Sequence, residues 1–267
     1  MTRSVLALLV FLSGLSFSAL AQEGVAEVVF ETDLEKNMWE KGIKEANPYP
    51  LFLAVHANDH TPTDAWQKVL TATEKKFKRT GVGLKLLRTI FEKSHKYLFK
   101  TYAQHSSFNQ MLQDGSFDCV SGSATLAMIL DQYGFDYAII ETDYHVFITT
   151  QLNGSTIILE STLPIGGMIT SATEVKKYLA NYQGESENQG LALTQRLGAP
   201  ALDDSDNGIF RKVDLQQLAG LQYYNDAIAH FNEQSFDIAV DQLEKAYQLY
   251  PADRIAGLKK LALSQKK

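Results

Sequence analysis

An Asn-Gly pair at 153–154 limits how this chain can fold more than any other feature of its sequence. It separates two stretches rich in β-branched and aromatic residues, 144–152 and 155–160, which read as strands. Asn-Gly favours a two-residue hairpin turn, because both residues readily adopt positive φ angles. Such a turn pairs Leu152 with Ser155, so the numbers of any two paired residues sum to 307. The register of the hairpin, and the face on which each side chain lies, follow from that sum.

This register brings a histidine and a glutamate to one face of the hairpin. Phe147 is expected opposite Glu160, and His145 opposite Thr162. Side chains alternate along a strand, so all four project from the same face, with His145 and Glu160 on a diagonal. Diagonal neighbours lie about 7–8 Å apart at the backbone, which a glutamate side chain can bridge. The hairpin therefore predicts a contact between His145 and Glu160. An exposed cross-strand pair on an open sheet face is the structural alternative.

The single cysteine of the 267 residues lies shortly before this hairpin. A turn at 114–118 leads into an apolar segment, which predicts a helix that begins at Cys119. Asp118 or Ser116 is expected to cap this helix, and Gly134 to end it. Main-chain amides and the helix dipole favour a thiolate at such a position, so the sulfur is a candidate nucleophile. A lone cysteine on an apolar helix face is otherwise a buried structural residue, and it cannot form an intramolecular disulfide.

An activated thiol requires a nucleophile, a base and a group that orients the base. The sequence offers Cys119, His145 and Glu160 for these roles. Cys119 is predicted to act as the nucleophile and His145 to accept its proton. Glu160 is predicted to fix the tautomer of the imidazole and to stabilise its positive form. A zinc site built from the same three residues is less expected, because close ligand pairs such as C-x-x-C are absent from the sequence. No metal ion or other cofactor is therefore expected.

The order of these residues resembles the core of the transglutaminase-like superfamily. The matching features are Cys119 at a helix start, a strand, His145 followed by a valine and an aromatic residue, and then an acid and a threonine, Glu160 and Thr162. They span roughly residues 116–164. The resemblance implies an α+β fold with a papain-like core, in which a helix that bears the thiol packs on an antiparallel sheet that bears the histidine and the acid. The family more often has aspartate at the acid position and tryptophan as the aromatic residue.

The resemblance also implies a chemistry. Hydrolysis of peptide or amide bonds, with water as the acceptor, is expected ahead of cross-linking, and the substrate would be a peptide or a protein. Gln113 lies six residues before Cys119, as the oxyanion glutamine of papain-type enzymes does, but it reads better as a loop residue. The amide of Cys119 is another candidate for the oxyanion donor. Because the superfamily includes members that have lost activity, a catalytically silent interaction module is the alternative function.

Residues 1–21 read as a secretory signal peptide. They contain a charged start with Arg3, an apolar run at 4–12 and a small-residue site that ends at Ala21. Export to the periplasm or the extracellular space is therefore expected. The net charge is −6, or −7 once Arg3 is removed, which argues against a phosphate-binding surface and against nucleic acid as a partner. No later stretch reads as a membrane span.

Apolar periodicity predicts a helical N-terminal part for the exported chain. Helices are expected over 31–46, from a start signal at 61–64 to Gly81, and from 84 through Tyr102. A further helix is expected at 171–182, behind the predicted strands. The histidines outside the predicted triad are expected to be packing residues: His56, His60, His95, His105 and His230.

The C-terminal segment has a signature of its own. Polar, turn-rich stretches at 183–190 and 203–208 indicate a boundary, which separates a transglutaminase-like domain at 22–205 from a helical region at 206–267. In that region, small and aromatic residues fall at the packing positions of one tetratricopeptide repeat, with a turn at Gln234-Ser235. They are Tyr223, Ala227, Phe231, Phe236, Ala239, Leu243, Ala246 and Pro251. One repeat cannot bury its own apolar face, so the unit must dock on the main domain, on a protein partner or on a second copy. An ordinary helical hairpin that closes the main domain is the alternative.

Overall fold

The protein has an α+β fold. A computed structural model describes residues 28–182 and 209–266, and within those ranges it contains ten helices, a five-stranded antiparallel sheet and a separate pair of short strands. The predicted signal peptide at 1–21 and the predicted domain boundary near 205 lie outside the described residues. No helix within the described ranges has the length and apolar character needed to cross a membrane.

The described helices form an N-terminal group of five, two that flank the sheet, and a C-terminal group of three. Their bounds are α1 Asp33–Glu45, α2 Pro48–Ala54, α3 Asp64–Thr80, α4 Leu84–Tyr97, α5 Phe108–Asp114, α6 Cys119–Gln132, α7 Ala172–Ala180, α9 Leu215–Asn232, α10 Phe236–Leu249 and α11 Asp253–Gln265. Thr32 and Asn47 cap α1 and α2, because their side-chain oxygens accept hydrogen bonds from main-chain amides of the first turn.

The five-stranded sheet has the order β6-β5-β4-β3-β7. Its strands are β3 Asp136–Thr142, β4 Val146–Leu152, β5 Ser155–Leu159, β6 Met168–Ile169 and β7 Phe210–Val213. The predicted hairpin register is confirmed, since Leu152 pairs with Ser155 and every other pair of β4 and β5 also sums to 307. Asn153 and Gly154 both have positive φ angles, 51° and 77°, as a type I′ turn requires.

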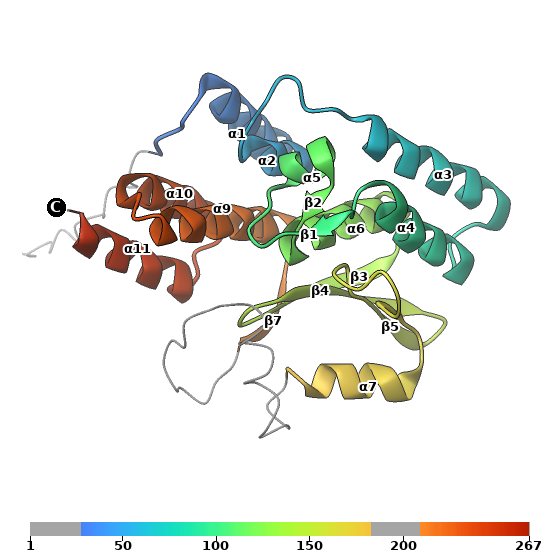
Figure 1. Ribbon diagram of the computed structural model, residues 1–267. Coiled ribbons are helices and arrows are strands. Elements are labelled where there is room, and N and C mark those ends of the chain that lie inside the picture. The colour runs from blue at the N-terminus through green and yellow to red at the C-terminus, as the bar shows by residue number, and fades with distance from the viewer. Residues whose placement is uncertain (1–27, 183–208, 267) are drawn as a thin grey trace, which may run out of the picture.

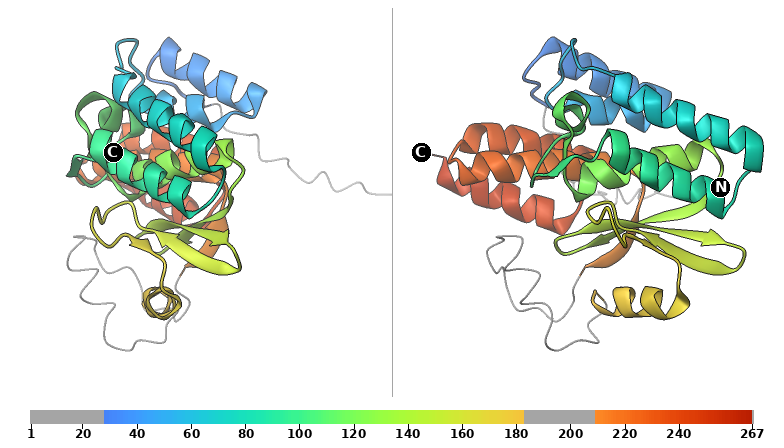
Figure 2. Two further views of the ribbon diagram at one scale, coloured as in Figure 1. Left: turned by 90° about the vertical axis from the view of Figure 1, so that its right-hand side faces the viewer. Right: turned by 45° about the vertical axis from the view of Figure 1, so that its right-hand side comes forward.

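Helices cover both faces of the sheet (Figures 1 and 2). α6 packs on β3 and β4 from one side, with α4 and α9 against it, and α7 packs on β5 from the other side. Alternation along the strands divides the side chains accordingly. Ile148 and Leu159 lie in the main core with α6, whereas Phe147 and Ile158 lie in a smaller cluster with α7. The register therefore assigns Glu160, which is expected opposite Phe147, to the α7 side.

Two N-terminal elements depart from the sequence prediction. The segment that begins at Pro48 forms a helix of its own, α2, because proline is tolerated in the first helical turn. The helix predicted through Tyr102 ends at Tyr97. Tyr102 belongs instead to β1, Thr101–Tyr102, which pairs with β2, Ser116–Phe117. The three- and four-residue spacing of apolar side chains continues past the helix end, so periodicity alone could not show this change.

The C-terminal segment is joined to both the sheet and the core. β7, which lies within the predicted helical region, pairs with β3 at the edge of the sheet. The predicted helix pair is present as α9 and α10, with the turn at Gln234-Ser235 between them, and α11 follows. α9 packs against α6 and α2, and its Leu218 and Leu221 are buried in the main core. Part of the apolar surface of these helices is thus covered by the rest of the chain.

Candidate active site

The helix that carries Cys119 begins where the sequence predicts. Asp118 caps α6 through a capping box: its Oδ1 accepts from the amide of Ser121 at 2.8 Å, and the Ser121 hydroxyl accepts from the amide of Asp118 at 2.9 Å. Asn225 of α9 donates to Oδ2 of Asp118 at 2.9 Å. Burial raises the pKa of this carboxyl. The start of α6 is therefore fixed by α9 as well as by its own cap.

The first turn of α6 lies against the ends of the central strands. Ser123 donates to the carbonyl of Val146, at the start of β4, at 3.2 Å. Gly122 leaves room for Ser161, just after β5, since a Cβ at position 122 would lie 2.6 Å from the Ser161 hydroxyl oxygen and 2.8 Å from its Cβ. This close approach brings the N-terminus of α6 to the strand ends beside His145 and Glu160.

His145 and Glu160 are in contact, as the hairpin register predicts. Nε2 of His145 lies 2.5 Å from Oε2 of Glu160, and the two side chains are only 10% and 3% exposed. Oε1 of Glu160 accepts from the amide and the hydroxyl of Thr162, at 2.9 and 2.6 Å. The hydroxyl of Tyr178 donates to Oε2. Because several donors hold this buried carboxylate, it can keep the imidazole in one orientation.

Cys119 is the third residue of the predicted site. The thiol is buried, and it is close enough to His145 to help raise the pKa of the imidazole. Burial acts to lower the pKa of His145, but the charge of Glu160 and the hydrogen bonds with Cys119 and Glu160 hold it well above the usual 6.5. Burial acts to raise the pKa of Glu160, but the charge of His145 and hydrogen bonds from His145, Thr162 and Tyr178 lower it to about 2. A positive imidazole thus lies between the Cys119 thiol and the Glu160 carboxylate.

Aromatic rings enclose the imidazole. The ring of Tyr182 stacks on that of His145 with 6.1 Å between centroids, and Phe147 stacks at 6.2 Å. Tyr178 meets Phe147 edge to face at 5.1 Å. Tyr178 and Tyr182 come from α7 and the turn after it, so the helix that covers the sheet also shields the ion pair from water. A shielded pair interacts more strongly than an exposed one.

Tyr102 of β1 also belongs to this environment. Burial, followed by the charges of Cys119, Asp118 and Glu160, raises the pKa of its phenol. Tyr102 therefore stays a neutral phenol that can donate a hydrogen bond, and the residue is 42% exposed. The sequence pattern indicates neither Tyr102 nor Tyr178 as a site residue. Apolar periodicity predicts a helix at Tyr102, and no local spacing links either tyrosine to Cys119.

The lowered pKa of Glu160 predicts a loss of stability in acid. A carboxyl with a pKa of about 2 in the folded chain and 4.5 when unfolded stabilises the fold above pH 4.5, and the contribution disappears as the pH falls towards 2. One pKa unit corresponds to about 1.4 kcal/mol, so the loss is on the order of 3 kcal/mol. Urea unfolding at a series of acidic pH values should show a steeper fall in unfolding free energy for the wild type than for Glu160→Gln, whose amide does not titrate. Equal slopes for the two proteins would contradict this linkage.

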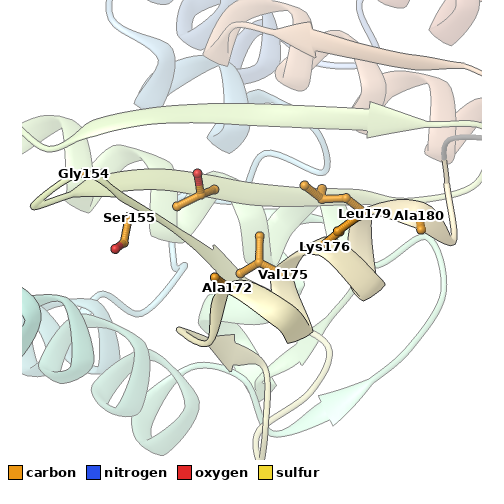
Figure 3. A pocket seen from close by; sticks show the side chains of 8 residues that line it. Gly154, Ser155, Ala172, Val175, Lys176, Leu179 and Ala180 are labelled. Carbon is orange, nitrogen blue, oxygen red and sulfur yellow. The ribbon is translucent and has the colours of Figure 1, made fainter.

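A surface hollow of about 470 Å³ lies between α7 and the turn end of the hairpin (Figure 3). Residues 154–156 line it from the hairpin, and Val175, Lys176 and Leu179 line it from α7. Glu160 follows the opposite end of β5, which is five residues long. At about 3.3 Å per residue, the two ends of this strand are well separated. The hollow is therefore distinct from the group around Cys119.

The structure brings together all three residues that the sequence predicts for the site: Cys119, His145 and Glu160. Gln113, the weaker candidate for an oxyanion donor, lies exposed near the end of α5. Residues that could share a metal ion form a different group, Glu31, Asp226 and His230. In comparisons with known proteins, no family model, curated protein or solved structure matches the chain.

Proposed function

We propose that this protein is an exported cysteine hydrolase of the transglutaminase-like type, which cleaves peptide or amide bonds. Cys119 is the nucleophile, His145 carries the proton, and Glu160 orients His145. The observation that carries the proposal is the buried contact of His145 with both Glu160, at 2.5 Å, and the Cys119 thiol. The layout, a thiol at a helix start beside a sheet that supplies histidine and acid at its strand ends, supports the assignment, and the signal-like segment at 1–21 supports export.

The reaction follows from these roles. The Cys119 thiolate attacks the carbonyl carbon, the imidazolium of His145 gives its proton to the leaving nitrogen, and an acyl thioester remains on the sulfur. Neutral His145 then takes a proton from water, whose oxygen attacks the thioester. The carboxylic acid leaves, and the thiolate and imidazolium are restored. The amide of Cys119 and the neutral phenol of Tyr102 are the candidate donors to the oxyanion.

Alkylation by iodoacetamide tests whether the thiol is activated. Cys119 is the sole cysteine of the chain, so every alkylation event measured by intact mass reports on it. The thiolate is the reactive form, and near neutral pH we expect the wild type to react about tenfold faster, or more, than His145→Ala. His60→Ala is the matched control, because His60 is exposed. Equal alkylation rates in all three proteins, or no reaction of the folded wild type, would contradict the proposal that Cys119 is activated.

Protein interaction is a second candidate function, favoured by exposed apolar side chains on the C-terminal helices. Ile238 and Tyr247 on α10 and Leu261 and Leu263 on α11 are all more than one-third exposed. We propose that α9, α10 and α11 form a tetratricopeptide-like unit that presents this surface to a protein partner. Docking surfaces often expose large apolar side chains.

Substitution is a better test of this surface than deletion, because α9 packs on α6 and its removal would open the core. Leu261→Asp combined with Leu263→Asp should abolish capture of partners from a cell-envelope extract and leave the melting temperature nearly unchanged, since both side chains are already exposed. An identical set of captured proteins for wild type and variant would rule out partner binding through these side chains.

A further inference from the structure

A second cluster of titratable side chains lies where the N-terminal helices meet α9. Asp226 and His230 are four residues apart on α9, so both project from one face of that helix. Glu31, just before α1, brings a second carboxylate, and the ligand atoms of these three residues lie within 4.8 Å of one another. His56, just after α2, reaches the same aspartate, with Nε2 2.8 Å from Oδ1. His56 and His230 are thus paired with a carboxylate, where the sequence predicted packing residues.

Asp226 carries the observation that points to a ligand. Its side chain is only 6% exposed. Its Oδ2 atom is buried and, among the described residues, has no hydrogen-bond partner. Nε2 of His230 lies 3.6 Å from it, which is beyond hydrogen-bond distance. A carboxylate oxygen that has lost its water and gained no donor is costly, and a bound cation would satisfy it.

We infer that Glu31, Asp226 and His230 bind a divalent metal ion of the zinc class. Zn²⁺ takes carboxylate oxygen and imidazole nitrogen ligands at about 2.0–2.2 Å, so two ligands of one tetrahedral ion lie about 3.3–3.6 Å apart. The ligand atoms of the three residues lie within 4.8 Å of one another, and Glu31 is exposed and can rotate inward to shorten these distances. Three protein ligands leave a fourth tetrahedral position for water.

Neighbouring side chains hold these ligands as metal sites require. Nε2 of His56 donates to Oδ1 of Asp226 and thereby leaves Oδ2 for the ion. Gln242 of α10 donates to Oε1 of Glu31 at 2.8 Å. Hydrogen bonds of this kind orient ligating carboxylates and support metal affinity. The site would join three segments that are distant in sequence: the approach to α1, the end of α2, and α9.

Calorimetric titration of the purified, EDTA-treated protein with zinc chloride tests the site. We expect one ion per chain, and a melting temperature that rises with zinc concentration because the ion binds the folded state. His56→Gln should weaken binding about 10–100-fold, as loss of an orienting hydrogen bond does, and His230→Gln should weaken it further. His60→Gln, at an exposed histidine outside the cluster, should bind as the wild type does.

Two further measurements identify the ligands. Co²⁺ in place of Zn²⁺ should give the visible absorption of a four-coordinate site with nitrogen and oxygen ligands only. A sulfur-to-cobalt charge-transfer band, or loss of binding in Cys119→Ser, would assign the ion to Cys119 and overturn the inference. Unchanged affinity in His230→Gln would overturn it as well. If Asp226→Asn does not fold, Glu31→Gln and His230→Gln decide the question, because neither residue is fully buried.

Discussion

Replacement of Cys119 by alanine is expected to abolish hydrolysis and to leave the fold in place. On a library of fluorogenic peptide amides, kcat/KM should fall about 10⁴-fold or more, because no acyl thioester can form without the nucleophile. The cap of α6 does not involve the sulfur, since Asp118 bonds Ser121 and Asn225. Thermal unfolding should therefore shift by only a few degrees.

Variants of the other two residues test the proposed division of roles. His145→Ala should come close to the loss seen with Cys119→Ala, because a nucleophile and its base act as a unit. Glu160→Gln keeps the size of the side chain but removes the charge that holds His145 positive, and should cost about 10²–10⁴-fold in kcat. His60→Ala serves as the control histidine. Activity that survives His145→Ala would rule out proton transfer by His145. Activity that survives Cys119→Ala would rule out Cys119 as the nucleophile.

The contact between His145 and Glu160 could be predicted because it depends on local rules. A two-residue turn at Asn153-Gly154 allows one register, and the register decides which side chains share a face. The start of α6 is local in the same way, since Asp118 and Ser121 form a capping box within four residues. The hairpin register and the predicted helix start are therefore enough to identify Cys119, His145 and Glu160 as the proposed thiol, base and acid.

The remaining parts of the site depend on contacts that sequence patterns do not encode. Asn225 bonds Asp118 across 107 positions, and Tyr178 reaches Glu160 from a separate helix. The four-residue strand β7 is set beside β3 by pairing across a long intervening segment, and its own short sequence gives little strand signal. Contacts of this range follow from tertiary packing, which overrides local propensity. Within the part of the chain that the structure describes, the buried Oδ2 atom of Asp226 lacks a hydrogen-bond partner because of how α9 packs against the N-terminal helices. No local sequence pattern indicates that packing.

Replacement of Glu35 by alanine is expected to cost about 3–5 kcal/mol of unfolding free energy. Lys245 of α10 is fully buried, and its Nζ lies 2.7 Å from Oε1 of Glu35 in α1. The same oxygen accepts from the hydroxyl of Tyr223 in α9 at 3.2 Å. Alanine would leave a buried ammonium group without its counter-charge, and that penalty is much larger than the net contribution of the pair itself. Urea unfolding followed by circular dichroism gives the free energy.

Two matched variants separate the buried charge from a simple loss of side-chain contacts. Glu40→Ala removes the partner of Lys36 in an exposed pair at 3.9 Å and should cost less than about 1 kcal/mol. Glu35→Leu combined with Lys245→Met removes both buried charges and should recover most of the loss, because apolar residues of similar size can replace a buried ion pair. A loss in Glu35→Ala as small as that in Glu40→Ala would mean that water reaches Lys245. Since Glu35, Tyr223 and Lys245 link α1, α9 and α10, we expect the destabilisation to appear in one cooperative transition. A separate early transition of the C-terminal helices would instead define them as a domain of their own.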